Sequence, residues 1–370
     1  MTSRAGWAWR PGRDALRAWL VSRAAVLALM ALAAYLQARH GFGRAPLRAG
    51  AGGFFVWDSD WYRRIAAEGY THPDMLRFFP LVALPGRLVA PFGTFAAGLA
   101  VLVVANVSAL VYADGIGRLA HLELGEQAGR WAPWLALVNP ASFVLVLGYA
   151  EATAAALGVW CFLALRRQAW GVAAGLAFLS GLTRPVGLLL ALPAFVEALR
   201  GLRLTPRREV LARALAVAAA PLGGAAYLLW VWAAHGDPML PFDVQQAGDL
   251  RSALLVWPGE ALGRGWLAVR GDGQVVDALH LLGVPLAAGL FVLVARRLPA
   301  SYTAYAAALL VVALGTPRLA SYERYALAAF PLIMVAAALR PRSARIVTWV
   351  VCCSGLAGYS VLAFAHRYVP

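Results

Sequence analysis

The sequence contains no lysine and little charge of any kind. Charged residues make up 14% of the 370 residues, whereas a soluble domain usually carries about 25%. Hydrophobic residues reach 61%, and apolar runs recur from one end of the chain to the other. This balance excludes an ordinary soluble protein and predicts one membrane-embedded domain over residues 1–370.

Acidic residues are the scarcer charged kind, with 18 Asp and Glu against 33 basic residues, all of them Arg. In a soluble protein such a basic excess suggests nucleic-acid binding. Here the Arg residues stand in short clusters between apolar runs, as topology signals do. The expected partner is therefore the lipid bilayer, and no nucleic acid is expected.

Cysteine and histidine are also rare. Cys161, Cys352 and Cys353 all lie in apolar runs, and the adjacent pair suits neither a disulfide framework nor tetrahedral metal spacing. The six His residues form no HxH or HxxxH pair. We expect no metal and no cofactor.

Long apolar runs are the main positive feature. A membrane-spanning helix needs about 20 mostly apolar residues, and about eleven runs approach that length. The sequence therefore predicts an all-α polytopic membrane protein with runs near 15–36, 95–117, 131–148, 150–165, 170–182, 185–199, 211–234, 279–295, 301–316, 325–339 and 346–365.

The Arg clusters predict an orientation. Alternate threading of the runs places the clusters at 166–167, 200–213, 296–297 and 340–345 on one side, the cytoplasmic side by the positive-inside rule. The N-terminus is expected on that side as an uncleaved anchor in the cell membrane. The other side receives two long segments, 37–94 and 235–278, and segments of such length usually serve function. The run 78–93 is short for a span, so we expect it to be re-entrant or interfacial.

An aromatic stripe marks the first of these segments. On a helix, Phe54, Trp57, Asp58, Trp61, Tyr62 and Ile65 share one face. Asp58 is the only charged residue of that face and must be desolvated, paired or used. Asp60, on the other face, is explained as a solvated partner of Arg64. An interfacial helix accounts for the aromatic residues but not for Asp58, which we predict to be functional.

Ordered motifs extend this observation. They are Trp57-Asp58 with Trp61-Tyr62, Ile65-Ala66, Gly69-Tyr70 and Phe78-Phe79-Pro80, then Asn139-Pro140-Ala141-Ser142, Tyr149-Ala150-Glu151-Ala152, Leu182-Thr183-Arg184-Pro185-Val186-Gly187, Gly236-Asp237-Pro238, and Arg324-Tyr325 before Ala329-Phe330-Pro331-Leu332. Over residues 55–335 the set resembles the GPI mannosyltransferase 2 family (the PIG-V type) and its prokaryotic relatives. Ala150 stands where that family usually has Ser.

The resemblance implies a GT-C-like fold and a glycosyltransferase. Such enzymes take a sugar, typically mannose, from a polyprenyl-phosphate donor on the extracytoplasmic side, with inversion and without a firm metal requirement. The family's first-loop Asp, the expected catalytic base, falls on Asp58, the residue that the stripe indicates independently. The acceptor is left open as a lipid, a glycan or a protein.

Further candidates would bind the substrates. Arg184 is the first choice for the donor phosphate, against a snorkelling role at the interface. Glu151 is a candidate to orient the acceptor, to pair with Arg184 or to cap its turn. Weaker candidates for substrate binding are Arg318, Arg324, His72, Asp237, Trp57, Trp61 and Tyr62.

Two other functions stay open at this point. A transporter or flippase of a lipid-linked sugar predicts ionisable residues at mid-membrane and repeat symmetry. A non-catalytic scaffold subunit needs no lone acid in the aromatic stripe. The clustering of polar groups on one side favours the enzyme.

Overall fold

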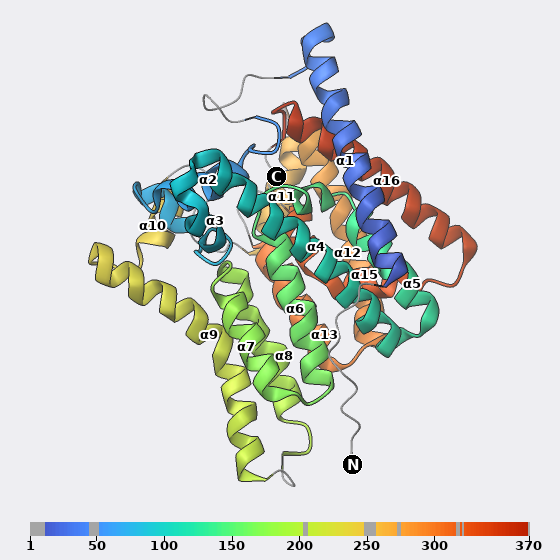
Figure 1. Cartoon of the computed structure of the whole chain (residues 1–370). Helices are drawn as coiled ribbons and strands as arrows, with labels where there is room; N and C mark the ends of the chain where they lie inside the picture. The colour runs from blue at the N-terminus through green and yellow to red at the C-terminus, as the bar shows by residue number, and fades with distance from the viewer. Residues whose placement is uncertain are drawn as a thin grey trace.

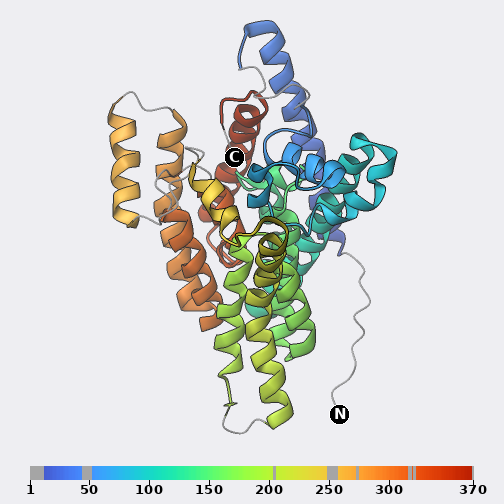
Figure 2. The same ribbon diagram turned by 90° about the vertical axis from the view of Figure 1, so that its left-hand side faces the viewer.

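The structure, a computed structural model, describes residues 12–43, 52–202, 206–247, 257–271, 275–315, 319 and 322–368. Every regular element in these ranges is a helix. Figure 1 shows a bundle of long helices, with the short helices α2 (Asp58–Glu68) and α3 (Leu84–Val89) at its upper left. Figure 2 shows α11 (Pro258–Arg270) and α12 (Val275–Arg297) side by side at the margin of the bundle.

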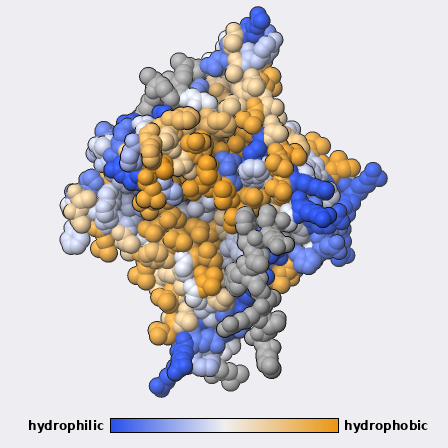
Figure 3. Space-filling view, viewed as in Figure 1, coloured by the Kyte–Doolittle hydropathy of each residue, from blue (hydrophilic) through white to orange (hydrophobic). Residues whose placement is uncertain are grey.

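Five helices are long and apolar enough to cross a membrane. They are α1 (Arg13–His40), α4 (Thr94–Leu124), α9 (Arg207–His235), α12 and α16 (Arg342–Phe364). Their outer faces expose Leu, Val and Phe side chains, and Figure 3 shows an apolar belt across the middle of the molecule. The polytopic all-α prediction is confirmed. The number of about eleven spans stays a prediction.

Shorter helices occupy the other predicted runs. They are α5 (Glu126–Val138), α6 (Glu151–Arg166), α7 (Trp170–Gly181), η4 (Pro185–Leu190) with α8 (Ala191–Ala198), α13 (Ala300–Leu314), and α14 (Tyr322–Ala328) with α15 (Phe330–Ala337). The predicted run 131–148 is not one helix. The Asn139 side-chain amide donates to the Leu135 and Ala136 carbonyls, and Pro140 cannot continue the helix. Only the 3-10 helix η3 (Ser142–Leu145) follows.

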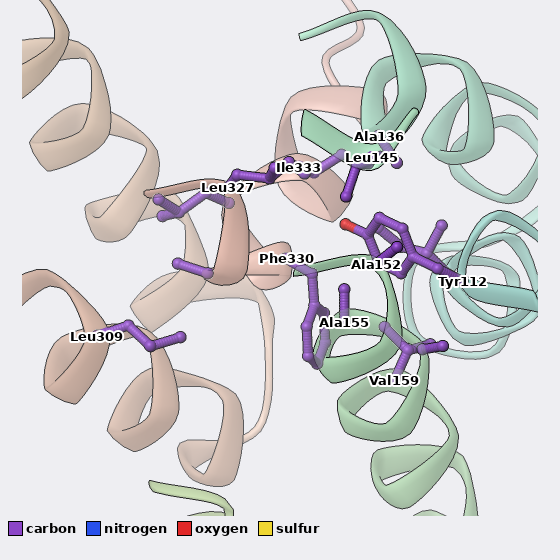
Figure 4. Packing of buried hydrophobic residues seen from close by; sticks show 14 of the residues in the cluster. Tyr112, Ala136, Leu145, Ala152, Ala155, Val159, Leu309, Leu327, Phe330 and Ile333 are labelled. Atoms are coloured by element: carbon purple, nitrogen blue, oxygen red, sulfur yellow. The ribbon is translucent and has the colours of Figure 1, made fainter. Parts of the chain in front are cut away.

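Close backbone contacts join α7 to α9 (Arg207–His235). A Cβ atom at Gly181 of α7 would lie 2.2 Å from the Ala220 carbonyl oxygen of α9, and one at Gly223 would lie 2.1 Å from the Phe178 carbonyl oxygen. Glycine lets the two backbones touch, as is common between membrane helices. On the other side of α6, Phe330 of α15 packs beside Ala155, and its ring centre lies 5.1 Å from that of Phe162 (Figure 4).

The two long loop segments contain helices of their own. The first holds α2 (Asp58–Glu68), η1 (Pro73–Arg77), α3 (Leu84–Val89) and η2 (Ala90–Phe92), and the second holds α10 (Leu240–Ala247) and α11. The six residues of α3 are too few to span a membrane. Its interfacial position stays a prediction.

The predicted helix over the aromatic stripe begins later than the pattern indicates. Its first residue is Asp58, and Trp57 before it has a φ of 55°. A non-glycine residue rarely adopts that conformation, which cannot belong to a right-handed helix. Phe54 and Trp57 therefore lie outside the helix.

Candidate functional site

Two clusters of charged side chains lie at opposite ends of α6. Glu151 is the first residue of this helix and Arg166 is the last, so the length of a 16-residue helix separates the clusters. At 1.5 Å per residue that is roughly 24 Å. The first cluster contains four of the residues that the sequence indicated, and the second contains Arg residues from the predicted cytoplasmic clusters.

The first cluster is a chain of four ion-paired residues, which we call the quartet: Asp58, Arg324, Glu151 and Arg184. The Arg324 Nη1 atom donates to Asp58 Oδ2 at 2.6 Å. Its Nε atom lies 3.0 Å from Glu151 Oε1, and Arg184 Nη1 lies 2.6 Å from the same oxygen. Two guanidinium groups therefore share one carboxylate oxygen, and the charges of the quartet balance.

Burial within the quartet is uneven. The side chains of Glu151 and Arg324 are 6% and 9% exposed, whereas that of Asp58 is 30% exposed. Aromatic rings cover the cations, since the Arg324 guanidinium lies 5.7 Å from the Tyr149 ring and that of Arg184 lies 5.6 Å from the Tyr325 ring. Asp58 is thus the member of the quartet that a substrate can reach.

Electrostatics keep both cations charged. Burial by itself would lower the pKa of the Arg324 guanidinium, but the carboxylates of Glu151 and Asp58 outweigh it and raise that pKa well above its ordinary value. Glu151 likewise raises the pKa of Arg184 against the effect of burial. Burial, and then the Asp58 carboxylate, raises the pKa of Tyr149, which therefore keeps its proton.

Three contacts position Asp58. The Trp57 indole N–H donates to the Ala363 carbonyl oxygen at 3.2 Å, the Asp58 N–H donates to the Tyr149 hydroxyl at 3.3 Å, and the Gly148 N–H donates to the Ser59 hydroxyl at 3.1 Å. The unusual φ of Trp57 costs about 1–3 kcal/mol, and such conformations persist where the surroundings hold them. The start of α2 is therefore fixed against both the end of α16 and the turn before α6.

A backbone turn after α7 positions Arg184 in the quartet. Thr183 Oγ1 donates to the Ser180 carbonyl at the end of α7, so the chain turns out of the helix immediately before Arg184. Gly187 then passes so close to α7 that a Cβ atom would lie 2.1 Å from the Ser180 carbonyl oxygen. Leu81 N–H donates to the Leu182 carbonyl oxygen at 3.2 Å, which brings the Phe78-Phe79-Pro80 motif to the same end.

The predicted surroundings of Asp60 are wrong. It was expected to be a solvated partner of Arg64, but its side chain is only 7% exposed and pairs with Arg63. Helix α2 packs against α4, where Tyr62 and Ala66 share an apolar cluster with Ala97 and Val101, so less of the helix faces solvent than the pattern indicates. The simple division of α2 into an aromatic and a solvated face is therefore wrong.

The remaining candidates have varied surroundings. Trp61 and Tyr62 pack on Phe78, with ring centres 5.7 and 5.3 Å away. The charges of the quartet also act on the Tyr62 hydroxyl. His72 and Asp237 are exposed and make local contacts, His72 with Asp74 and Asp237 with the Met239 N–H. Arg318 lies outside the described residues.

Sequence reasoning missed Tyr149 and Ser59 as site residues. Tyr149 stands two positions before Glu151 in a motif that was recognised, but nothing in its spacing indicated a contact with residue 58. Glu323 is adjacent to Arg324 in the sequence but belongs to a separate buried network, in which it accepts from Tyr359 and contacts the His280 ring nitrogen at 2.7 Å.

The second cluster joins four helix ends. The Arg166 side chain lies 2.6 Å from Glu123 and 3.5 Å from Glu197. Glu197 also pairs with Arg200 at 3.0 Å and accepts from the Ser301 hydroxyl. The contacts confirm that residues predicted to share one side lie together. Which side faces the cytoplasm stays a prediction.

The quartet has the groups needed to move a proton and to stabilise an anion. Its reachable carboxylate can accept a proton, and its buried cations can bind a phosphate. Within the described ranges, no group of three or more His, Cys, Asp or Glu residues is placed to hold a metal ion.

No protein-family model and no curated protein matches the sequence. Among solved structures, the chain is similar to the oligosaccharyltransferase of Archaeoglobus fulgidus, crystallised with a tethered acceptor peptide that contains the NVT sequon, at a TM-score of 0.44 and 12% identity. The likeness covers 93% of this chain and 55% of the other, so this chain spans about half the length of that protein. A score of this size establishes no shared activity, and the chemistry of the site is taken from its own geometry.

Proposed function

We propose that this protein is a membrane glycosyltransferase of the GT-C type, which moves a sugar from a polyprenyl-phosphate donor to an acceptor hydroxyl. The observation that carries the proposal is the quartet, in which a reachable carboxylate is paired with a buried Arg at one end of an apolar bundle. The ordered resemblance to the GPI mannosyltransferase 2 family supports mannose as the sugar and the extracytoplasmic face as the site.

In the proposed reaction the acceptor oxygen attacks the anomeric carbon while Asp58 takes the proton from the hydroxyl. The bond between the anomeric carbon and the phosphate oxygen breaks, and the electron pair leaves with the polyprenyl phosphate. Arg184 and Arg324 stabilise the charge that develops on this phosphate. The Arg324 Nε atom lies near Glu151 without a well-aligned hydrogen bond, which leaves donor capacity for a phosphate oxygen.

Glu151 has a positioning role in this proposal. Because both guanidinium groups contact its Oε1 atom, they are held side by side before the substrate arrives. Pre-organised charges of this kind stabilise a transition state without reorganising during the reaction. Glu151 itself is buried and is therefore not placed to receive the acceptor proton.

No observation in the described residues specifically favours the alternative function, a transporter or flippase of a lipid-linked sugar. It requires ionisable groups deep in the bundle. In the described residues, Glu197 near the end of α8 and Arg213 near the start of α9 are buried charged side chains that lie toward helix ends. Asp114 lies further inside α4, where Arg118 neutralises it one turn away.

The test is to incubate membranes containing the full chain with polyprenyl-phosphate mannose labelled in the sugar, and in parallel with the labelled glucose donor. The expected result is transfer of label from mannose to a lipid, glycan or protein fraction, and no transfer by the Asp58→Asn protein. Label that crosses the bilayer still attached to its lipid would instead indicate the flippase. Equal transfer by the wild type and Asp58→Asn would remove the base assignment.

A further inference from the structure

An apolar groove with a basic end lies far from the quartet. It has a volume of about 420 Å³ and opens between α5, α15 and α16. Helix α16 ends beside Trp57, whose indole donates to the Ala363 carbonyl oxygen. The residues of that helix that line the groove lie at its start, between Arg342 and Val350. At 1.5 Å per residue these positions are roughly 20–30 Å apart. The groove is therefore no part of the catalytic proposal.

The lining of the groove is apolar along most of its length and basic at one end. Two tryptophans, Trp131 and Trp349, meet edge to face with ring centres 5.7 Å apart, and Leu135, Ile346 and Val350 line the space beside them. Arg342, Arg345, Ile346 and Trp349 follow one another at helical spacing on a single face of α16. The groove is thus apolar and aromatic along most of its length and cationic at the first turn of α16.

The positive charge at the first turn of α16 is not balanced by an acidic side chain of the described residues. Neither Arg342 nor Arg345 has an acidic partner among the residues that the structure describes, and residues 340–350 include three Arg and no Asp or Glu. Hydrophilic side chains gather at the right-hand edge of the molecule in Figure 3, where α16 begins in Figure 1. Unpaired guanidinium groups beside an apolar groove are complementary to a ligand with an anionic head and an apolar tail.

We propose that this groove binds one anionic phospholipid, with its phosphate at Arg342 and Arg345 and an acyl chain along Trp131, Leu135 and Trp349. Arg binds phosphate through its planar fork, and tryptophan favours the level of the lipid headgroups. Basic pockets between membrane helices bind anionic headgroups. A volume of 420 Å³ lies within the usual range for ligand pockets. The apolar lining favours a lipid over free phosphate.

The experiment uses the full chain purified in detergent and equilibrated with equal amounts of phosphatidylglycerol and phosphatidylcholine. Native mass spectrometry then measures the lipids that each protein retains. The wild type should prefer phosphatidylglycerol, and Arg342→Gln with Arg345→Gln should reduce the preference about fivefold for each Arg removed. The matched control is Arg296→Gln with Arg297→Gln, which removes the same charge from the exposed end of α12 and should keep the preference.

A second measurement locates the lipid. Phosphatidylglycerol with brominated acyl chains should quench tryptophan fluorescence less in Trp349→Phe than in the wild type, because a tryptophan beside the lipid has been removed. The proposal is overturned if the wild type retains both lipids equally, if the two double variants lose the preference equally, if Trp349→Phe leaves quenching unchanged, or if a second copy of the chain fills the groove as a dimer. Retention of free inorganic phosphate in place of lipid would also overturn it.

Discussion

The two clusters at the ends of α6 both pair Arg with Asp or Glu side chains. One cluster exposes an Arg to solvent, and the other exposes a carboxylate. In the cluster of Glu123, Arg166, Glu197 and Arg200, the carboxylates are 8% and 6% exposed, and Arg200 is 45% exposed. In the quartet the guanidinium groups are covered, and the carboxylate of Asp58 is the open member. Both clusters join distant helices, but of the two only the quartet exposes an acid beside a covered cation.

This reversal has a physical reason. A long Arg side chain can bury its stem and keep its charge in water, which suits a cluster that only fastens helix ends. A buried guanidinium must instead be paired, and it retains its charge in a poorly solvated place where it acts strongly on a bound anion. We therefore expect changes in the quartet to affect turnover, and changes in the cluster around Glu197 to affect stability.

Asp58→Asn should have the largest effect. The amide keeps the shape of the side chain but cannot accept the acceptor proton, so the transfer rate should fall at least about 100-fold. Glu197→Gln should keep transfer per folded molecule within about twofold. Rates are measured on membranes with matched protein content. Equal losses of transfer rate in Asp58→Asn and Glu197→Gln would show that the two clusters do not differ in function.

Arg184→Ala should reduce transfer about 100-fold, since a cation that stabilises the leaving phosphate is removed. Arg184→Lys keeps the charge without the planar fork and should lose only about tenfold. Because Arg184→Ala also leaves Glu151 with one partner fewer, thermal unfolding is measured on both variants. The phosphate role is wrong if both variants turn over like the wild type.

Glu197→Gln should lower the free energy of unfolding by about 1–3 kcal/mol. The substitution weakens the bonds from Arg166 and Arg200 while keeping a side chain that Ser301 can reach. Thermal unfolding in detergent measures the effect, with Asp74→Asn as the control, because that side chain in η1 is 44% exposed. An unchanged midpoint would show that this cluster does not fasten the helices.

Tyr149→Phe should slow transfer by about two- to tenfold, because the Asp58 N–H loses its acceptor, a bond worth about 0.5–1.5 kcal/mol. Tyr112→Phe is the control, since the buried Tyr112 hydroxyl has no hydrogen-bond partner among the described residues. A slower rate in Tyr112→Phe of the same size would mean that Tyr149 acts through general packing and not through Asp58.

The smallest effect concerns pH. Burial lowers the pKa of His366, whose ring lies 5.4 Å from that of Trp57, below its ordinary value of 6.5. The unfolded chain therefore binds a proton more readily than the folded one, so this contribution to stability is present above pH 6.5 and is lost as the pH falls below it. His366→Gln should reduce the loss of stability between pH 7 and pH 5, measured by unfolding at each pH. An unchanged pH dependence would contradict the prediction.

Local patterns predicted much of the fold. Apolar runs mark helices because burial in lipid or protein depends on each segment's own hydropathy, and every predicted run coincides with one helix or a broken pair. Errors arose where a tertiary contact overrode a local rule. Trp57 leaves the helix because its indole is fixed to α16, and less of α2 faces solvent than the pattern indicates because α2 packs on α4.

The sequence by itself determined that the chain is built for a membrane, that its polar groups divide between two ends, and that Asp58 is unusual on its helix face. These properties follow from composition and from the period of the helix. Only the tertiary structure decided that Asp58 pairs with Arg324, 266 positions away, and that Glu151 links Arg324 to Arg184. No local pattern encodes such pairs, because the packing of whole helices brings their ends together.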